Sequence, residues 1–591
     1  MRLFIRLIWG LILTGCAVAA ASEPAPHHVS LQKTDTGWVL LRGGAPYVVK
    51  GAGGDHSLEA LAAAGANSIR LWDFANARPI MDEAHRLGLS VTLGIWLGHE
   101  RHGFNYSDEA AVAEQLERVR AAVLEYRDHP ALLIWGLGNE MEGFEAGDNP
   151  SVWQAVNDAA KLIKSLDPHH PVMTVTAELG GERIRFVHEV CDAIDIHGVN
   201  SYGGATSVGN RIAAAGGEKP YLVTEYGPYG TWESPNTAWG SPIEPTSSQK
   251  AASYRAAYVA NLPTHQPASL GSYAFTWGAK MEATETWFGM WLRDGTRLGA
   301  VDALTDLWGG KAPPDLAPSI EPIVLSDGGE HDPGDVIDVT VNVEDEEDER
   351  LRLEWRLLPE SGEWLTGGDV RPILAPIDDA LVTKSATGAT VRMPEVPGHY
   401  RLFVTAYDSA GGAATANVPL KVRGEPRTRF PVTVYHEDIG GMRWVPSGWM
   451  GETEALALDN VDTAYDGLKS LRVRFEGRAW AGIAWQHPAN DWGDQPGGFD
   501  LSGAKALELW ARGEYGGESV TFGVGILESD KPYPDSGKRQ SKPIELTSEW
   551  QRYTVPLRGL DLDTIKTGFV ITVTGRTTPV TFYLDKIRFI D

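Results

Sequence analysis

Cysteine is scarce in this chain. Only Cys16 and Cys191 occur among its 591 residues. Cys16 lies in an N-terminal segment that combines two early arginines, a short apolar run over 7–13 and small residues over 14–21, which is the pattern of an export signal. Once such a signal is removed, Cys191 is the one cysteine left. An intramolecular disulfide is then excluded, and the core must stabilise the fold.

Long hydrophobic runs are also lacking. The run over 7–13 is too short to span a bilayer. Residues 13–16 (Leu-Thr-Gly-Cys) resemble the bacterial lipoprotein box, in which the cysteine is lipidated after cleavage, whereas residues 18–22 offer an ordinary cleavage site. We therefore expect an exported protein, either periplasmic, secreted or an outer-membrane lipoprotein, that contacts a membrane only through a lipid on Cys16.

Basic residues are outnumbered, because 52 Lys and Arg stand against 79 Asp and Glu and give a net charge of −27. This balance argues against nucleic acid and anionic membrane surfaces as partners. No Cys/His cluster has zinc-ligand spacing, and the glycine-rich segment 50–54 lacks the full phosphate-binding pattern. Tryptophan, in contrast, is abundant at 21 residues. Soluble proteins often use its flat ring to bind sugars.

The length predicts several domains, since single cores stop growing at roughly 250 to 300 residues. From 48 to 310, short β-branched runs alternate with helical stretches, which predicts a (β/α)8 TIM barrel. A doubly wound open sheet is the alternative, but it rarely needs eight strands. The predicted strands are 48–52, 68–72, 90–96, 132–137, 172–176, 193–199, 221–224 and 269–276.

Two β-rich regions follow a proline-rich linker at 311–318. The first has period-two patterning over about a hundred residues and predicts an immunoglobulin-like β-sandwich that serves as a spacer. The second has the length of a β jelly roll. The predicted domains are a signal at 1–22, the barrel at 23–312, the sandwich at 313–424 and the jelly roll at 425–591.

Acidic residues end two of the predicted barrel strands. Strand four ends in Asn139-Glu140, and strand seven ends in Glu225. Active sites of such barrels lie at the C-terminal ends of the strands, so both carboxylates project into one mouth. Cleavage of a glycosidic bond needs such a pair, because one carboxylic acid protonates the leaving oxygen and the other attacks the anomeric carbon or activates water.

This pattern over 48–310 resembles clan A glycoside hydrolases, the group that includes families 2 and 5. The resemblance implies that Glu140 is the acid/base and Glu225 the nucleophile of a retaining double displacement. It also implies that Asn139 contacts the sugar 2-hydroxyl. No cofactor is needed for transfer of a glycosyl group to water.

The resemblance extends to supporting residues, each with a structural alternative. Arg70 would supply positive charge or form a structural ion pair, Tyr202 would donate to the nucleophile or pack a loop, and Trp277 would lie under the reacting sugar or fill the core. His197 is balanced between barrel interior and site, and Glu142 is expected at the rim. The supporting candidates are Arg70, His99, Asn139, Asn200, Tyr202 and Trp277.

Further aromatic residues lie where sugars would bind. We expect two or three of those around the barrel mouth to stack on sugar rings and the others to be core: Trp72, Trp96, Tyr229, Trp232, Trp239, Trp287 and Trp291.

The C-terminal jelly roll resembles a carbohydrate-binding module. Five tryptophans divide between a stacking platform and the core: Trp444, Trp449, Trp480, Trp485 and Trp492. Such modules often hold a structural calcium, for which Glu437 and Asp585 are the candidate ligands.

The sequence therefore predicts a retaining hydrolase of β-linked polysaccharide or oligosaccharide, an endo-β-glucanase in the first instance. The barrel begins soon after the signal, unlike classical family 2, and departs from family 5 at strands three and six, so clan A families acting on β-1,3-glucan are included. One alternative is a β-glucan transglycosylase with the same residues. Another is a non-catalytic surface glycan-binding lipoprotein, which the presence of both carboxylates disfavours.

Overall fold

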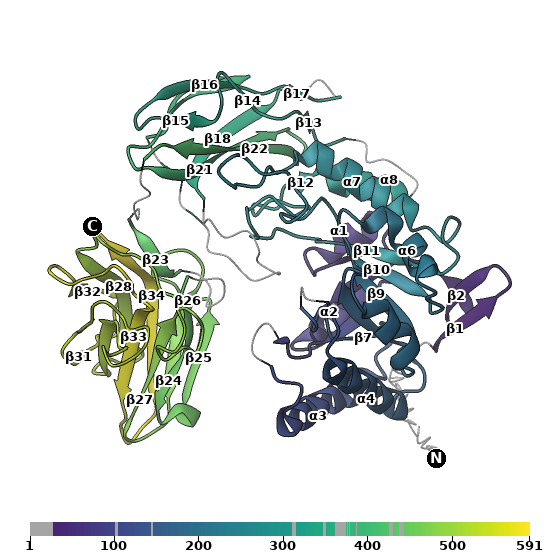
Figure 1. Ribbon diagram of the computed structural model, residues 1–591, viewed down its shortest axis with the longest axis horizontal. Coiled ribbons are helices and arrows are strands. Elements are labelled where there is room, and N and C mark those ends of the chain that lie inside the picture. The colour runs from purple at the N-terminus through teal and green to yellow at the C-terminus, as the bar shows by residue number, and fades with distance from the viewer. Residues whose placement is uncertain are drawn as a thin grey trace, which may run out of the picture.

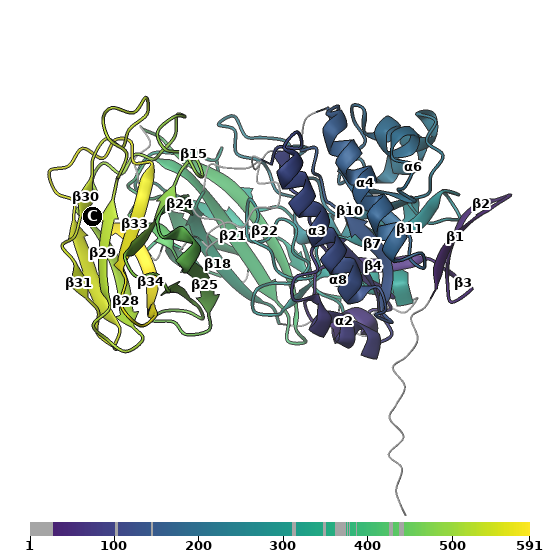
Figure 2. The same ribbon diagram turned by 90° about the horizontal axis from the view of Figure 1, so that it is seen from below.

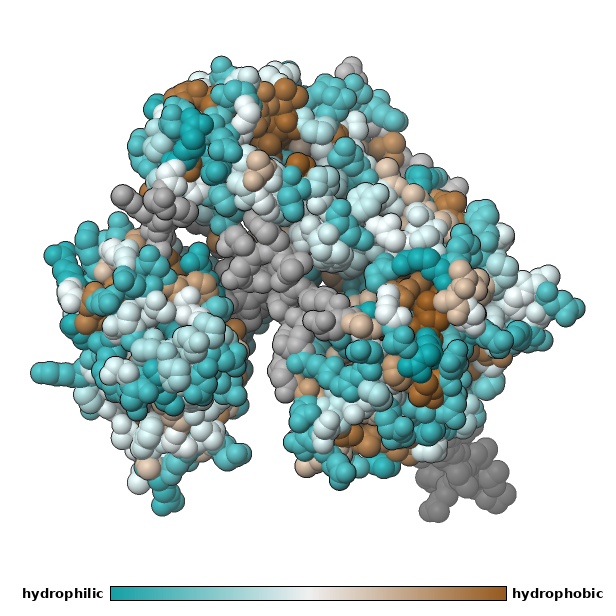
Figure 3. Space-filling view, viewed as in Figure 1, coloured by the Kyte–Doolittle hydropathy of each residue, from teal (hydrophilic) through white to brown (hydrophobic). Residues whose placement is uncertain are grey.

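The computed structural model forms three bodies, with the middle one bridging the other two (Figure 1). It describes residues 28–100, 104–143, 146–309, 315–346, 350–360, 374, 376–377, 379–385, 387–424, 430–436 and 443–591. Within these ranges no helix is long and apolar enough to cross a membrane. The predicted signal, with Cys16, lies outside the described residues. The face in Figure 3 is largely hydrophilic over the C-terminal body, whereas hydrophobic side chains gather over the middle body and beside the barrel.

The first body is a closed barrel of eight parallel strands in the order β10-β11-β4-β5-β6-β7-β8-β9, so the predicted barrel is confirmed. Its strands are almost wholly buried, as expected where both faces of a parallel sheet are covered. They are β4 (Val49–Gly53), β5 (Ser68–Leu71), β6 (Ser90–Ile95), β7 (Leu132–Leu137), β8 (Val172–Ala177), β9 (Ile196–Asn200), β10 (Tyr221–Tyr226) and β11 (Ser269–Ala274).

Helices surround the barrel. Side-chain caps fix where several of them begin: Asp108 accepts the backbone N–H of Ala110 and Ala111, and Thr246 forms a capping box with Gln249. The helices are α1 (Leu58–Ala63), α2 (Ala77–Arg86), α3 (Glu109–Tyr126), α4 (Pro150–Leu166), α5 (Arg183–Arg185), η2 (Phe186–Val190), η3 (Ala205–Ser207), α6 (Val208–Ala214), α7 (Ser247–Ala260) and α8 (Gly299–Gly309).

An antiparallel sheet that the sequence analysis missed precedes the barrel. It consists of β1 (Val29–Thr34), β2 (Gly37–Arg42) and β3 (Ala45–Tyr47). Its backbone amides bond to the carbonyls of His169 and Pro267, which lie just before β8 and β11. The sheet therefore covers the N-terminal ends of the barrel strands, opposite the end that carries Glu140 and Glu225.

The middle body contains two main antiparallel sheets, in the orders β22-β21-β18 and β14-β16-β20-β19, and the short pair β13-β17. The strand β12 (Arg297–Leu298) comes from the barrel side and joins the first sheet beside β22. The strands are β13 (Ser319–Ile320), β14 (Val324–Leu325), β15 (Glu330–His331), β16 (Val336–Thr340), β17 (Val343–Glu344), β18 (Arg352–Pro359), β19 (Leu381–Lys384), β20 (Gly388–Arg392), β21 (Gly398–Tyr407) and β22 (Gly412–Val422).

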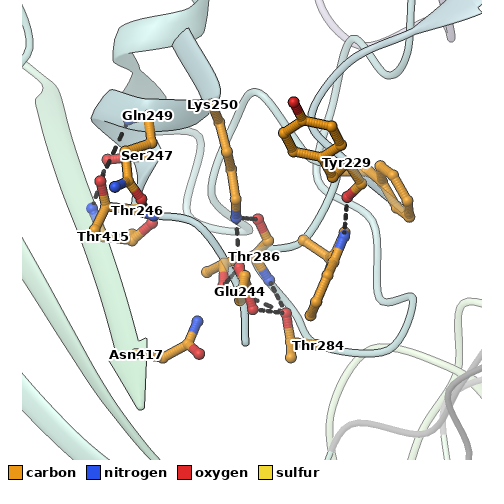
Figure 4. A network of polar contacts seen from close by, with 12 residues as sticks. Tyr229, Glu244, Thr246, Ser247, Gln249, Lys250, Thr284, Thr286, Thr415 and Asn417 are labelled. Atoms are coloured by element: carbon orange, nitrogen blue, oxygen red, sulfur yellow. Dashed lines mark hydrogen bonds and ion pairs between the residues drawn. The ribbon is translucent and has the colours of Figure 1, made fainter. Parts of the chain in front are cut away.

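Polar contacts join this middle body directly to the barrel. Arg401 on β21 is 1% exposed, forms an ion pair with Glu360 and donates to the carbonyl of Pro242 at 2.7 Å. The backbone N–H of Thr415 donates to Ser247 Oγ at 2.9 Å, at the start of α7 (Figure 4). The domain is thus packed on the barrel, in contrast to the separating role that the sequence predicts.

The C-terminal body is a sandwich of two six-stranded sheets, seen at the left of Figure 2. The first contains β25-β26-β34-β28-β32 with β23, and the second contains β24-β27-β33-β29-β30 with β31. The strands are β23 (Val432–Tyr435), β24 (Val445–Gly451), β25 (Leu456–Val461), β26 (Ser470–Phe475), β27 (Trp480–Gln486), β28 (Ala506–Gly513), β29 (Ser519–Val524), β30 (Arg539–Gln540), β31 (Ile544–Glu545), β32 (Gln551–Pro556), β33 (Thr567–Thr574) and β34 (Val580–Ile590); the short helix η4 (Thr453–Ala455) precedes β25.

Candidate active site

The two predicted carboxylates come from strand ends on the same side of the barrel. Glu225 lies within β10 and pairs in register with Asn200 at the end of β9. Glu140 follows β7 after a turn in which Gly138 has φ 72° and Glu140 itself φ 53°. The backbone N–H of Glu140 donates to the carbonyl of Val175 at 2.9 Å, which fixes this left-handed residue against β8.

Three side chains donate hydrogen bonds to the carboxylate of Glu225. Arg70 Nη1 and Trp72 Nε1 both reach Oε1 at 2.8 Å, and the Tyr202 hydroxyl reaches Oε2 at 2.9 Å. Arg70 is 3% exposed and Glu225 5% exposed, so the ion pair is shielded from water. One cation and two neutral donors stabilise the ionised carboxylate, which is the form that a nucleophile needs.

The Tyr202 hydroxyl keeps its proton in this position. Burial first, and then the negative charge of Glu225, raise the pKa of Tyr202 well above its ordinary value. The phenol therefore keeps its proton at neutral pH and donates a hydrogen bond to Glu225.

Glu140 has a different environment. Its Oε1 accepts a hydrogen bond from Asn200 Nδ2 at 2.7 Å, and no cation contacts it among the described residues. Burial, followed by the negative charge of Glu225, raises the pKa of Glu140 to about 8. Glu140 is therefore protonated at neutral pH and can give a proton to a leaving group.

Amide side chains connect the two carboxylates. Asn139 Oδ1 accepts from Arg70 Nη2 at 2.7 Å and from Asn200 Nδ2 at 3.0 Å. Thr224 Oγ1 donates to Asn200 Oδ1 at 2.8 Å. Because both donors use Asn139 Oδ1, the Nδ2 end of that amide is turned away from them.

The structure thus brings together Glu140, Glu225, Arg70, Asn139, Asn200 and Tyr202 from the predicted set. Trp277 is 1% exposed, and its ring packs at 5.5 Å from Trp291 and 6.2 Å from Trp308. This position favours the core-filling alternative for Trp277.

Both candidate histidines are buried. His99 is 3% exposed and stacks on Trp96 at 4.6 Å between ring centroids. His197 is fully buried and bonds to Thr176 at 2.9 Å and to His188 at 3.0 Å.

Glu142 is not the rim residue that its sequence position suggests. It is 4% exposed and accepts from Arg183 Nε at 2.8 Å and from the backbone N–H of Ala177 at 2.9 Å. Burial raises its pKa. This buried ion pair holds the segment after Glu140 against the end of β8.

Sequence reasoning treated Trp72 only as an aromatic face and missed its role as a donor to Glu225. It also missed an aromatic wall formed after β11. The Phe275 ring lies 5.8 Å from Trp72 and 5.9 Å from Tyr202, and Phe288 lies 5.2 Å from Tyr202. Phe275 follows β11 directly, so the rule that strand ends form the site would have found it.

In the C-terminal domain Trp444 and Trp485 are fully buried, Trp492 is half-buried, and Trp449 and Trp480 are 42% and 47% exposed. Trp444 and Trp485 therefore belong to the core, and Trp449 and Trp480 are the ones left open for the predicted stacking platform.

The calcium prediction stays a prediction. Glu437 lies outside the described residues, and the carboxylate of Asp585 accepts backbone N–H groups from Tyr465, Asp466 and Lys586. The described residues contain no group of three or more His, Cys, Asp and Glu side chains that could hold a metal ion.

Comparison with known proteins agrees with this geometry. Residues 55–259 match the family model "Glycosyl hydrolases family 2, TIM barrel domain", and residues 431–591 match "Carbohydrate binding domain 30". A closed barrel that brings two carboxylates to one mouth is an arrangement that can cleave a glycosidic bond. The barrel is therefore similar to the TIM barrel domain of family 2 glycosyl hydrolases, and the C-terminal body is similar to carbohydrate binding domain 30.

Solved structures are similar only in part. A β-D-glucuronidase of Dictyoglomus thermophilum is 16% identical with a TM-score of 0.39, over 49% of this chain and 54% of that one. A family 2 β-galacturonidase from Eisenbergiella tayi is 18% identical with a TM-score of 0.38, over 48% and 55%. An endo-β-1,4-mannanase from Thermotoga petrophila is 14% identical with a TM-score of 0.31, over 64% and 98%. The chain spans about half the length of the first two. No curated protein matches the sequence.

Proposed function

We propose that the protein is a retaining glycoside hydrolase that cleaves β-linked polysaccharide by double displacement. The observation that carries the proposal is the contrast between two neighbouring carboxyl groups. Glu225 is held by a cation and two further donors, whereas Glu140 has a pKa raised to about 8. When the surroundings of two carboxyl groups differ in this way, the group held by a cation suits the role of nucleophile, and the group that keeps its proton suits the role of acid.

In the first step Glu225 attacks the anomeric carbon and forms a glycosyl ester. The bond from that carbon to the leaving oxygen breaks, and the oxygen takes the proton of Glu140. In the second step ionised Glu140 removes a proton from water, the water oxygen attacks the same carbon, and the ester breaks to release Glu225. Arg70, Trp72 and Tyr202 hold the Glu225 carboxylate in place for attack.

The substrate class in this proposal is β-glucan, including β-1,3-glucan, with cleavage within the chain. The carbohydrate-binding domain 30 and its exposed Trp449 and Trp480 support a polysaccharide rather than a small glycoside. The N-terminal segment supports an exported enzyme, anchored by a lipid if Cys16 is modified.

A polysaccharide panel tests this function. The purified full-length protein is incubated with β-1,3-, β-1,4- and β-1,6-linked glucans and with mannan, and the products are sized. We expect short oligosaccharides from at least one glucan. Products longer than the substrate would instead establish a transglycosylase, and absence of turnover on every substrate would contradict the proposal.

Two variants assign the roles. Glu225→Ala should abolish turnover, and Glu140→Ala should impair substrates with poor leaving groups far more than activated aryl glycosides, which need no proton. Glu125→Ala, at a carboxylate whose side chain is 49% exposed on α3, is the matched control. Equal losses on both substrate classes in Glu140→Ala would remove Glu140 as the proton donor.

A further inference from the structure

A short segment after β10, residues 229–233, folds over the end of β9 beside the active site. Glu233 anchors it, because its carboxylate accepts the backbone N–H of Gly203 at 2.9 Å and of Gly230 at 2.9 Å. The carbonyl of Tyr229 accepts from Trp287 Nε1 at 2.9 Å. The segment is therefore tied both to the residue after Tyr202 and to the loop that follows β11.

The loop after β11 is itself fixed to the loop after β10. The buried carboxylate of Glu244 pairs with Lys250 and accepts from the hydroxyls of Thr284 at 2.6 Å and Thr286 at 2.7 Å (Figure 4). Lys250 also donates to the carbonyl of Thr286 at 2.7 Å. Segment 229–233 thus rests on a rigid support.

Trp232 projects from this segment. Its ring lies 5.6 Å from the ring of Tyr202 at 83°, and Tyr202 donates to Glu225. The ring also covers Gly230 so closely that a Cβ at that position would lie 2.4 Å from ring atoms. Although these contacts fix it, Trp232 remains 50% exposed. An aromatic face that is held in place and open to solvent can stack on a sugar ring.

The charged side chains around segment 229–233 are engaged with partners. Lys280 lies over the Phe275 ring at 5.6 Å and pairs with Glu282 at 3.6 Å. The carboxylate of Glu233 is directed at backbone amides. A neutral sugar ring suits these surroundings better than an anionic one, which would bring a further negative charge beside Glu225 and Glu282.

We propose that Trp232 is a specificity-determining residue that stacks on a neutral pyranose ring of the glycan, next to the ring bound at Glu225. This inference rests on the proposed function. The apolar face of a pyranose covers the exposed face of the indole, while its hydroxyls remain free for polar contacts. The residue thereby selects oligosaccharides over single sugars.

The test compares two substrates of the same enzyme, a β-linked glucan hexasaccharide and β-glucosyl fluoride. The fluoride has only one ring, so a second-ring contact contributes nothing to its cleavage. The hexasaccharide is laminarihexaose or cellohexaose, whichever the wild type cleaves faster. The quantity measured is the ratio of kcat/KM for this hexasaccharide to kcat/KM for the fluoride. We expect Trp232→Ala to lower this ratio by about tenfold, mainly through KM, the order of magnitude of one aromatic contact.

Three further variants control the result. Trp232→Phe should keep the ratio within about threefold, because a ring remains. Gly230→Ala should lower it as Trp232→Ala does, since the new Cβ displaces the indole. Tyr515→Ala removes an aromatic ring that is 87% exposed in the C-terminal domain and should leave the ratio unchanged.

An unchanged ratio in Trp232→Ala would overturn the inference while leaving the proposed function intact. An equal fall on both substrates would also overturn it, because Trp232 would then only support Tyr202. A wild type that cleaves neither substrate would contradict the proposed function itself, and the inference with it.

Discussion

Replacing Glu140 by Gln tests the raised pKa through stability rather than through activity. A carboxyl group whose pKa is higher in the folded chain binds its proton more tightly when folded. Its contribution to stability is complete below its ordinary pKa of 4.5 and is lost as the pH rises through about 8. The Gln variant has nearly the same shape and does not titrate. It should therefore escape this loss.

The magnitude follows from the shift. Between pH 6 and the folded pKa of about 8 lie about two pH units, and each is worth about 1.4 kcal/mol. On raising the pH from 6 to 9, the wild type should therefore lose about 3 kcal/mol relative to Glu140→Gln. For a domain of this size that corresponds to roughly 6–12 °C in the barrel's melting temperature.

Thermal melting of both proteins at pH 6 and pH 9 measures the effect. The difference between variant and wild type should grow with pH in favour of the variant. Glu125→Gln, at an exposed carboxylate, should show no such divergence. An equal difference at both pH values would refute the reasoning. In the same pH range kcat/KM of the wild type should fall above about pH 8, as Glu140 loses its proton.

Further predictions follow from single contacts. Tyr202→Phe removes a donor to Glu225 and should lower kcat by about 10- to 100-fold without unfolding the protein, measured by steady-state kinetics and melting. Arg401→Met leaves Glu360 charged and buried and should destabilise the protein by about 3–5 kcal/mol in denaturant unfolding, with recovery when Glu360→Gln is added. Trp449→Ala and Trp480→Ala should weaken binding to insoluble glucan in pull-down assays while kcat/KM on β-glucosyl fluoride stays unchanged.

The barrel and its carboxylates could be predicted because they follow from position alone. Parallel strands place their C-terminal ends on one face of the barrel, so Glu140 and Glu225 lie on the same face whatever the conformation of the loops. The supporting Arg70 and Asn200 lie within strands and follow the same rule.

Side chains beyond the strand ends were harder to predict. The strand-end rule reaches Phe275, which directly follows β11, but the two-residue period of a strand no longer applies beyond it. The sequence therefore cannot tell that the Trp277 ring packs against Trp291. The donor role of Trp72 depends on its distance to Glu225, which only the folded barrel sets.

The small N-terminal sheet did carry a local signal. Gly43-Gly44, both with positive φ, separates β2 from β3 as the two-residue turn of a hairpin does. The buried ion pair of Arg401 and Glu360 has no local sequence signal, because it depends on how the middle body docks on the barrel.

The stereochemistry of cleavage tests the central claim most directly. Proton NMR spectra are recorded within the first minutes of hydrolysis of a β-linked glucan oligosaccharide, before the products mutarotate. Double displacement through Glu225 predicts that the β-anomer appears first. Initial release of the α-anomer would mean single displacement by water and would contradict the assignment of Glu225 as the nucleophile.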